Sequence, residues 1–344
     1  MHNDISIEEA FEKENVFFVD VRSPDEFAKD AIPSAVNVPI LDNEQRAQVG
    51  KIYQELGPKE ARFLAVKLVS PLLPEKIKTI RDLADGKIVV VYCWRGGMRS
   101  KAMCEFLNLA GIPTLRLAGG YKSYRRFINN YFNEPPNFNF LVLYGLTGVG
   151  KTEILERLSF KDIPTLNLEA LAKHRGSVFG AVGLPSQPSQ KKFETDLYSV
   201  LNQYQANQYI FVEGESKKIG KLFIPEKIYA AIQRGKRILI YDSMLNRVNR
   251  IIKEYLVESK YNIQEFETAI THLQKRIGNS KMQELLELLY TENFAEIVKE
   301  LLISYYDKLY HHPDNPSIEY DFCISSANID SAVLQLYKYY QLLS

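Results

Sequence analysis

One stretch of this chain carries the residues of a phosphate-binding loop. It reads GLTGVGKT and matches the G-x-x-x-x-G-K-T pattern at all four fixed positions. Backbone N–H groups of such a loop point at one phosphate cluster, and the following helix adds the positive end of its dipole. Lys151 is predicted to reach the terminal phosphates, and the Thr152 hydroxyl to ligate Mg²⁺ if the ion is present. The predicted anion-binding residues of this loop are Gly145, Thr147, Gly148, Val149, Gly150, Lys151 and Thr152.

A second stretch, YCWRGGMRS from Tyr92 to Ser100, carries a cysteine followed by glycines and arginines. Cys93 lies between an apolar run and a predicted helix, close in sequence to Arg95 and Arg99. A thiol in such positively charged surroundings is expected to have a lowered pKa and to act as a nucleophile. The backbone of the glycines can turn N–H groups toward a group carried on the sulfur. The loop residues predicted to surround that group are Trp94, Gly96, Gly97 and Met98.

Two chemistries fit this cysteine loop. The thiolate can accept and carry a chalcogen atom, or it can attack phosphorus as tyrosine phosphatases do. The spacing from Cys93 to Arg99 satisfies the phosphatase pattern, but Tyr92 stands where those enzymes usually have histidine. The other two cysteines, Cys104 and Cys323, lack such surroundings and are predicted to be structural. Cysteines so far apart predict neither a disulfide framework nor a zinc site.

Strands and helices alternate along the chain in an order that positions both loops. Apolar runs predict strands at 16–21, 87–92, 114–117, 140–144, 209–212 and 237–241, and the helical pattern covers 43–69 and 73–84. Such alternation predicts parallel α/β sheets, which bind ligands at the carboxyl ends of their strands. Glu213 and Glu215 directly follow the strand at 209–212, so both are predicted to lie at the phosphate site.

A polar linker with two prolines, NEPPNFN at 133–139, separates two such strand–helix series. It predicts two α/β domains, at 1–134 and 135–344, the second of them P-loop NTPase-like. A stretch of the second domain at about 245–312 is helix-rich and is predicted to be a helical insertion or extension. His311 and His312, at its end, are predicted to form a surface turn.

The composition is that of an ordinary soluble protein, with 46% hydrophobic and 25% charged residues. The formal net charge is +1, so RNA contacts would depend on local basic patches. The N-terminal residues lack the apolar core of a signal peptide, and no apolar run is long enough to span a membrane. These features predict a cytoplasmic protein.

Several stretches of the sequence resemble known families. DVRSPDEF (20–27), IPSAVNVP (32–39) and the cysteine loop are similar to a rhodanese-type sulfurtransferase domain, although the loop is one residue longer than usual. With the P-loop, NEQRAQVGKIY (43–53), LAGGYKSYRRF (117–127) and LEALAKHRGSVFG (168–180), they resemble the bacterial tRNA 2-selenouridine synthases. The resemblance extends to about Ser216, and YYDKLY (305–310) resembles the family more weakly.

The resemblance implies a rhodanese-like first domain and a transferase that acts in two steps. Members of this family geranylate 2-thiouridine at the tRNA wobble position with geranyl diphosphate, and then replace the geranylthio group with selenium from selenophosphate. Cys93 matches the family's catalytic cysteine for the selenium step, and Arg99 and Arg95 are its predicted charged partners. No tightly bound cofactor is implied, because geranyl diphosphate and selenophosphate are co-substrates and Mg²⁺ at Thr152 is a candidate ion.

The implied partners are tRNA and the enzyme that supplies selenophosphate, and a monomer is favoured. Lysine and arginine side chains bind phosphates, and a tyrosine ring can stack on an unpaired base. The predicted tRNA-binding residues are Tyr121, Lys122, Arg125, Arg126, His174 and Arg175. Arg247, Arg250 and Lys253 form a further basic helix face, suited to tRNA or to plain solvation.

Two other functions fit the same motifs. One is a nucleotide-dependent P-loop enzyme whose sulfurtransferase or phosphatase-like rhodanese domain does not act on tRNA. The other is a non-catalytic RNA-binding or scaffold protein with a structural P-loop. No guanine-type N-K-x-D signature follows the loop, and Glu213 stands where a Walker-B aspartate is expected. Both observations favour a loop that holds a diphosphate without a hydrolytic cycle.

Overall fold

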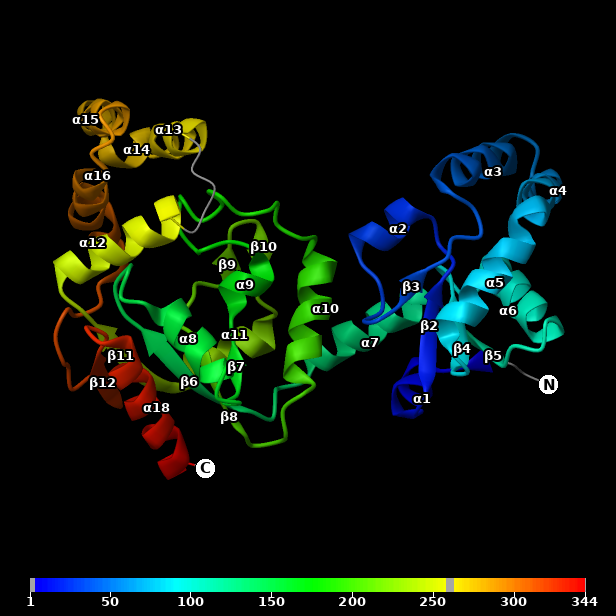
Figure 1. Cartoon of the computed structure of the whole chain (residues 1–344), viewed down its shortest axis with the longest axis horizontal. Coiled ribbons are helices and arrows are strands. Elements are labelled where there is room, and N and C mark those ends of the chain that lie inside the picture. The colour runs from blue at the N-terminus through cyan, green and yellow to red at the C-terminus, as the bar shows by residue number, and fades with distance from the viewer. Residues whose placement is uncertain (1–3, 258–262, 344) are drawn as a thin grey trace. The chain divides into compact units, whose positions relative to one another are not determined.

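The computed structural model describes residues 4–257 and 263–343 and contains two five-stranded parallel sheets (Figure 1). The chain divides into two units, one built on residues up to Tyr131 with Glu194–Asp196, the other on Phe132–Phe193 and the chain from Leu197. The predicted boundary at 134/135 falls between helix α7 (Tyr121–Asn133) and strand β6 (Asn139–Tyr144). Each unit has its own sheet, so the predicted α/β class is confirmed.

The first sheet has the strand order β1-β5-β4-β2-β3. Its strands are β1 (Asp4–Ile5), β2 (Val16–Asp20), β3 (Val36–Asn37), β4 (Ile88–Tyr92) and β5 (Thr114–Leu117). Strand β4 lies at the centre, and its residues from Val89 to Tyr92 are fully buried, as expected for a parallel strand covered on both faces. The sequence did not predict β1, because two residues give no periodic signal. Cys93 follows the central strand directly.

The helices of the first unit are α1 (Ile7–Glu12), α2 (Pro24–Lys29), α3 (Asn43–Glu55), α4 (Pro58–Val69), η1 (Ser70–Leu72), α5 (Leu73–Ala84), α6 (Met98–Leu109) and α7. The helical pattern predicted at 43–69 is two helices. Gly57 has φ +89° and Pro58 occupies the first turn of α4, so the backbone must turn before the second helix can begin.

The second sheet has the order β12-β11-β6-β8-β7. Its other strands are β7 (Thr165–Leu166), β8 (Tyr209–Glu213), β11 (Lys236–Tyr241) and β12 (Phe322–Ser325), and a hairpin joins β9 (Lys218–Ile219) to β10 (Leu222–Phe223). Strand β6 lies between β8 and β11, with Leu143 paired with Glu213. The phosphate loop therefore opens from the central strand, and Glu213 ends the neighbouring strand.

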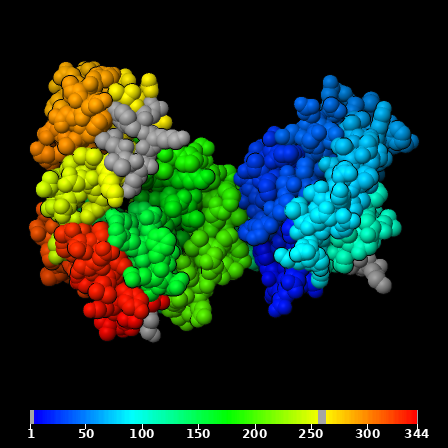
Figure 2. All heavy atoms as spheres, viewed as in Figure 1, coloured from blue at the N-terminus to red at the C-terminus, as the bar shows by residue number. Residues whose placement is uncertain are grey.

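The helices around this sheet are α8 (Lys151–Ser159), α9 (Leu168–Ala172), α10 (Gln190–Leu201), α11 (Glu226–Gln233) and α18 (Ile329–Leu343). Side chains of α8 and α18 share one hydrophobic core with the sheet, including Leu143, Ile154, Phe211 and Leu336. Figure 2 shows the red atoms of the C-terminal segment lying against the green atoms that include the phosphate-loop helix. This core therefore fixes α8, which begins at Lys151, against the sheet.

A helical segment in yellow and orange (Figure 1) follows β11. Its elements are α12 (Met244–Ile252), η2 (Lys253–Val257), α13 (Ile263–His272), α14 (Gln274–Ile277), α15 (Asn279–Tyr290), α16 (Phe294–Leu301), η3 (Leu302–Tyr306) and α17 (Asp307–Tyr310). It has its own core, including Phe266, Ile270, Leu285 and Leu302. The predicted helical C-terminal portion is confirmed, except at 258–262, which lie outside the described residues. No described helix is long and apolar enough to cross a membrane.

Candidate active sites

Cys93 lies at the carboxyl end of β4, in front of the N-terminus of α6, which Gly97 caps. Its side chain is buried, and the sulfur lies 3.2 Å from the Ser100 hydroxyl oxygen. That hydroxyl also donates a hydrogen bond to the Gly97 carbonyl oxygen at 3.2 Å. The thiol therefore lies in contact with one hydroxyl group, which the first turn of α6 provides.

The glycine pair before α7 allows that helix to approach the cysteine loop. The N–H of Tyr121 donates to the Cys93 carbonyl oxygen at 2.8 Å, and the N–H of Lys122 donates to that of Trp94 at 3.0 Å. Gly120 has φ +60°, and a Cβ atom there would lie 2.2 Å from the Cys93 carbonyl oxygen and 2.4 Å from the Gly96 nitrogen. The LAGGYKSY motif is thus a support for the cysteine loop.

Gly120→Ala is expected to destabilise the protein by about 2–4 kcal/mol, because the methyl group overlaps the cysteine loop and the backbone is left-handed. Gly111→Ala is the matched control, since Gly111 has φ +78° but open space around the position of a Cβ atom. Urea unfolding of both variants separates the overlap from the backbone strain. Equal losses in the two variants would contradict a steric role for Gly120.

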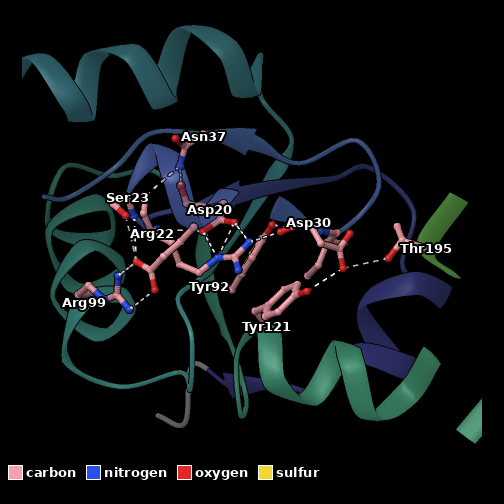
Figure 3. Close-up of polar contacts among 11 residues, drawn as sticks. Asp20, Arg22, Ser23, Asp30, Asn37, Tyr92, Arg99, Tyr121 and Thr195 are labelled. Carbon is pink, nitrogen blue, oxygen red and sulfur yellow. Dashed lines mark hydrogen bonds and ion pairs between the residues drawn. The ribbon is translucent and has the colours of Figure 1, made fainter. Parts of the chain in front are cut away.

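A buried ion pair joins Arg22 to Asp20 within the DVR motif (Figure 3). Arg22 is 1% exposed and donates to both carboxylate oxygens of Asp20, at 2.6–3.0 Å. Its guanidinium lies 4.0 Å from the centre of the Tyr121 ring, and the Tyr121 hydroxyl donates to Asp30 at 2.7 Å. The Tyr121 ring is 2% exposed, so the predicted stacking of this ring on a base does not fit the structure. Its contacts are those of a structural residue.

The basic residues of α7 differ in exposure. Arg125 is buried and lies 3.6 Å from the Asp30 carboxylate, so its charge is paired inside the protein. Lys122 and Arg126 are exposed and four residues apart, which places them on one face of the helix. The predicted contact with tRNA phosphates suits these two exposed residues and not Arg125.

The two arginines of the cysteine loop also differ. Arg99 donates to both carboxylate oxygens of Glu26, at 2.6 and 3.3 Å (Figure 3), whereas Arg95 is exposed. Burial alone would raise the pKa of Glu26, but the hydrogen bonds and charge of Arg99 lower it overall. An anion at Arg99 would therefore compete with Glu26. The sequence reasoning missed Arg116, which donates to the Gly96 carbonyl oxygen at 3.1 Å and pairs with Asp4.

Lys151 lies inside the phosphate loop, where its ammonium group donates to the carbonyl oxygens of Gly145 and Leu146 at 3.0 and 3.5 Å. Gly148 and Gly150 have φ values of +83° and +85°. These left-handed conformations are accessible to glycine at little cost, and they let successive N–H groups turn toward one anion. The predicted loop geometry is therefore present at the start of α8.

Two arginines of α12 donate hydrogen bonds to carbonyl oxygens of this loop. Arg247 donates to the Thr147 carbonyl oxygen at 2.8 Å, and Arg250 donates to the Gly148 carbonyl oxygen at 2.6 Å. Arg247 is 2% exposed and forms a two-point ion pair with Asp307. The prediction that these arginines form a basic face for solvent or tRNA is therefore wrong. Their guanidinium groups form hydrogen bonds and ion pairs inside the second unit.

Three carboxylates lie beside the phosphate loop. The Thr152 hydroxyl oxygen is 2.9 Å from Glu213 Oε1 and 3.3 Å from Glu169 Oε2. Glu213 is 1% exposed, and its Oε2 atom has no hydrogen-bond partner among the described residues. Burial, followed by the charge of Glu215, raises the pKa of Glu213 to about 8, and burial with Glu213 raises the pKa of Glu169 well above its usual value. These shifts favour the protonated carboxyl groups, which repel a bound anion less than carboxylates do.

Glu169 was missed by the sequence reasoning, although it lies within the LEALAKHRG stretch, one residue into α9. No group of three or more His, Cys, Asp or Glu side chains in the described part of the chain is arranged to hold a metal ion by itself. Mg²⁺ commonly takes one or two carboxylates together with substrate phosphates and water. The oxygen atoms around Thr152 suit that pattern, and the ion predicted there would depend on a bound anion.

The loop after α9 lies over these carboxylates. Gly176 has φ +65°, and a Cβ atom on it would lie 2.8 Å from Glu215 Oε2 and 3.1 Å from Glu169 Oε1. Arg175 forms an ion pair with Glu254 at 2.5 Å and lies over the Tyr255 ring. The predicted loop near the phosphate site is therefore present, with the Arg175 charge paired. Burial lowers the pKa of His174, whose half-buried ring lies against Gly180.

A cavity of about 470 Å³ connects the phosphate loop to the helical segment. Lys151, Thr152, Glu169 and Glu215 contribute polar walls. Apolar walls come from Phe179, Ile251, Phe266, Phe294, Ile297 and Leu301, with Tyr255, Tyr306 and Tyr310 beside them. A site of this kind suits a ligand with an anionic head and a hydrocarbon chain.

His312 also lines this cavity, so the predicted surface turn at this residue is wrong. Its Nδ1 atom lies 2.9 Å from the Tyr320 hydroxyl oxygen. Burial, followed by the charge of Lys151, lowers the pKa of His312 to about 4. The ring is therefore neutral at physiological pH.

Comparisons with known proteins match both units of the chain. A family model described as the tRNA 2-selenouridine synthase AAA domain matches residues 138–327, and a rhodanese-like domain model matches residues 6–126. A tRNA 2-selenouridine synthase of Shewanella halifaxensis is 32% identical over 327 residues, covering 86% of this chain and 87% of that protein. Another, of Nitrosomonas eutropha, is 33% identical over 293 residues, covering 82% of this chain and 74% of that protein.

Proposed function

The chain belongs to the tRNA 2-selenouridine synthase family, and from this membership we propose that it performs two successive transfers on tRNA. In the first, geranyl diphosphate geranylates the sulfur of 2-thiouridine at the wobble position. In the second, selenium from selenophosphate replaces the geranylthio group. A tRNA substrate implies a cytoplasmic location and a partner enzyme that makes selenophosphate.

The observation that carries the first step is the cavity shared by the phosphate loop and the helical segment. A diphosphate group suits the N–H groups of the loop and the Lys151 ammonium, and a ten-carbon chain suits the apolar walls formed by residues such as Phe266 and Leu301. The apolar walls offer a place for a hydrocarbon chain, which a nucleotide lacks.

Departure of diphosphate requires that its developing negative charge be stabilised. The N–H groups of the loop can do this with the backbone already held, because Arg247 and Arg250 bind the Thr147 and Gly148 carbonyl oxygens. The Lys151 ammonium group would turn from the Gly145 carbonyl oxygen toward the diphosphate. A Mg²⁺ ion bound at Thr152 would neutralise further charge on the diphosphate oxygens. The sulfur of thiouridine then forms the bond to the geranyl carbon, so no protein nucleophile is required.

For the second step, we assign the nucleophile to Cys93 and the donor-binding region to the loop of Trp94, Gly96, Gly97 and Met98. Arg95 and Arg99 supply positive charge for the selenophosphate anion. Arg99 must release the Glu26 carboxylate before it can bind that anion. In the net reaction, geranylthiolated tRNA, selenophosphate and water give selenated tRNA, geranyl thiol and phosphate.

Replacing both Lys122 and Arg126 by alanine is expected to weaken binding of all tRNAs similarly, because both side chains are exposed and would contact phosphates. The salt dependence of binding should flatten by about one unit for each lost phosphate contact. Filter binding or fluorescence anisotropy at several salt concentrations measures this. Lys59→Ala, at an exposed position of α4, is the control. An unchanged salt slope in the double variant would show that Lys122 and Arg126 are solvated surface residues that do not contact tRNA phosphates.

The experiment that tests the proposed function is mass analysis of nucleosides from thiolated tRNA incubated with the protein and both co-substrates. Geranylated thiouridine should form with geranyl diphosphate alone, and selenouridine after selenophosphate is added. Hydrolysis of ATP or GTP by the protein, with no change in the tRNA nucleosides, would instead support a nucleotide-dependent enzyme.

A further inference from the structure

The YYDKLY motif at 305–310 spans the end of η3 and the short helix α17. Tyr306 and Tyr310 are four residues apart, so they project from one side of the helix, and both line the cavity beside the phosphate loop. Burial, followed by the charge of Glu215, raises the pKa of the Tyr310 hydroxyl. Tyr310 lines the cavity together with Glu169 and Glu215 of its polar side.

Asp307, between the two tyrosines, ties the motif to the phosphate loop. Its carboxylate receives two hydrogen bonds from Arg247, at 3.0 and 2.5 Å, and Arg247 donates to the Thr147 carbonyl oxygen at 2.8 Å. Two-point arginine–carboxylate pairs have a fixed geometry, and this arginine is 2% exposed. The chain of contacts from Thr147 through Arg247 to Asp307 sets the distance between the tyrosine rings and a bound diphosphate.

We propose that Tyr306 and Tyr310 are catalytic residues of geranyl transfer, whose ring faces stabilise the positive charge that develops on the allylic carbons, and that Asp307 and Arg247 position them. The inference rests on the proposed function. The bond between C1 of the geranyl group and the diphosphate oxygen breaks, and its electron pair leaves with diphosphate. The sulfur of 2-thiouridine donates an electron pair to C1, and the N3 proton of the base passes to water.

Aromatic rings suit this task because their faces are negative and cannot be alkylated as easily as a carboxylate or thiolate. The cation forms next to its diphosphate partner, so the stabilising group must lie between the phosphate loop and the apolar walls. Tyr310 meets that condition because it lines the cavity together with Lys151 and Glu215 and packs against the cores of both the sheet and the helical segment. Phe179 and Phe266 also line the cavity from the core of the helical segment, to which Tyr306 belongs as well, and they suit the hydrocarbon chain.

Conservative and non-conservative replacements at Tyr306 and Tyr310 test the proposal. Phenylalanine keeps the ring face and should leave single-turnover geranylation within about threefold of the parent. Leucine removes it and should slow geranylation about 30-fold per site, the effect of a desolvated cation–π contact, with little change in the KM for geranyl diphosphate. Tyr290→Leu, at an exposed tyrosine of α15 in the same segment, is the control, and thermal unfolding checks that each variant is folded.

Two measurements distinguish charge stabilisation from simple packing. Mono-, di- and trifluorinated phenylalanines at position 310 keep the ring shape but progressively weaken its negative face, so the logarithm of the geranylation rate should fall with each fluorine. Citronellyl diphosphate lacks the allylic double bond, and it should bind but not react. A flat fluorine series, or transfer from citronellyl diphosphate at the geranyl rate, would overturn the proposal.

Assaying the parent protein in parallel distinguishes a failure of this inference from a failure of the proposed function. If the parent does not geranylate thiolated tRNA, the proposed function fails and the inference falls with it. If the parent geranylates, and the leucine variants do so at the parental rate while folded, only the role of the tyrosines is rejected.

Discussion

Replacing Cys93 by alanine is expected to leave a protein that geranylates 2-thiouridine in tRNA but makes no 2-selenouridine. The reason is that Cys93 belongs to the first unit, at the end of β4, whereas the phosphate loop and its cavity are built from residues of the second unit. Loss of a catalytic nucleophile typically lowers a rate by several orders of magnitude, about 10³-fold or more. Mass analysis of tRNA nucleosides should show the geranylated nucleoside accumulating.

Cys104→Ala is the matched control for this prediction. Cys104 is also buried in the first unit, on α6, where its thiol lies 3.7 Å from the Thr114 carbonyl oxygen, away from the cysteine loop. Its loss should leave selenation intact. Selenouridine formed at the parental rate by a Cys93 variant would contradict the assignment of the nucleophile, and loss of geranylation in a folded Cys93→Ala protein that binds tRNA would contradict the division of the steps.

Replacing Lys151 by alanine is expected to have the opposite effect. Geranylation should fall about 10²- to 10³-fold, because removal of one preorganised group that stabilises developing negative charge costs this much in other enzymes. The same variant should still convert tRNA that already carries the geranylthio group, since that step uses the cysteine loop. Incubation of thiolated and pre-geranylated tRNA in parallel, followed by nucleoside mass analysis, measures both rates.

Lys161→Ala, at an exposed lysine of the second unit, controls for a general loss of positive charge. The Lys151 ammonium group donates to the Gly145 and Leu146 carbonyl oxygens of its own loop, so its removal should change the unfolding temperature little. Retained geranylation in Lys151→Ala would remove the phosphate loop from the first step. Loss of both steps would show that the two chemistries are not separable by unit.

The sequence by itself determined the local backbone of the two loops to which we assign chemistry. Both loops combine an apolar run, closely spaced glycines and a helix start, so their backbone geometry is encoded by contiguous residues. Gly148 and Gly150 have the left-handed conformations that the GLTGVGKT pattern requires, and Cys93 follows a central strand as its position after KIVVVY predicts. The parallel α/β class follows from the same alternation of strands and helices.

Only the tertiary structure decided which charged and aromatic residues act together. Arg247 and Arg250 have the spacing of a solvated helix face, and that spacing is the same whether the face meets water or buried carboxylates. Asp307, 60 positions from Arg247 in sequence, supplies the partner that makes burial of this arginine tolerable. Such pairings depend on how distant segments pack, and helical periodicity carries no information about them.

The same reason applies to the aromatic residues. Tyr121 follows two glycines beside basic residues and resembles a base-stacking residue, but the fold encloses it over Arg22. Tyr306 and Tyr310 lie in a plain helical pattern, and the fold brings them to a cavity whose phosphate loop is more than 150 residues earlier in the chain. A ring is hydrophobic on its faces and polar at its hydroxyl, so the side chain suits both places and only packing against distant segments selects between them.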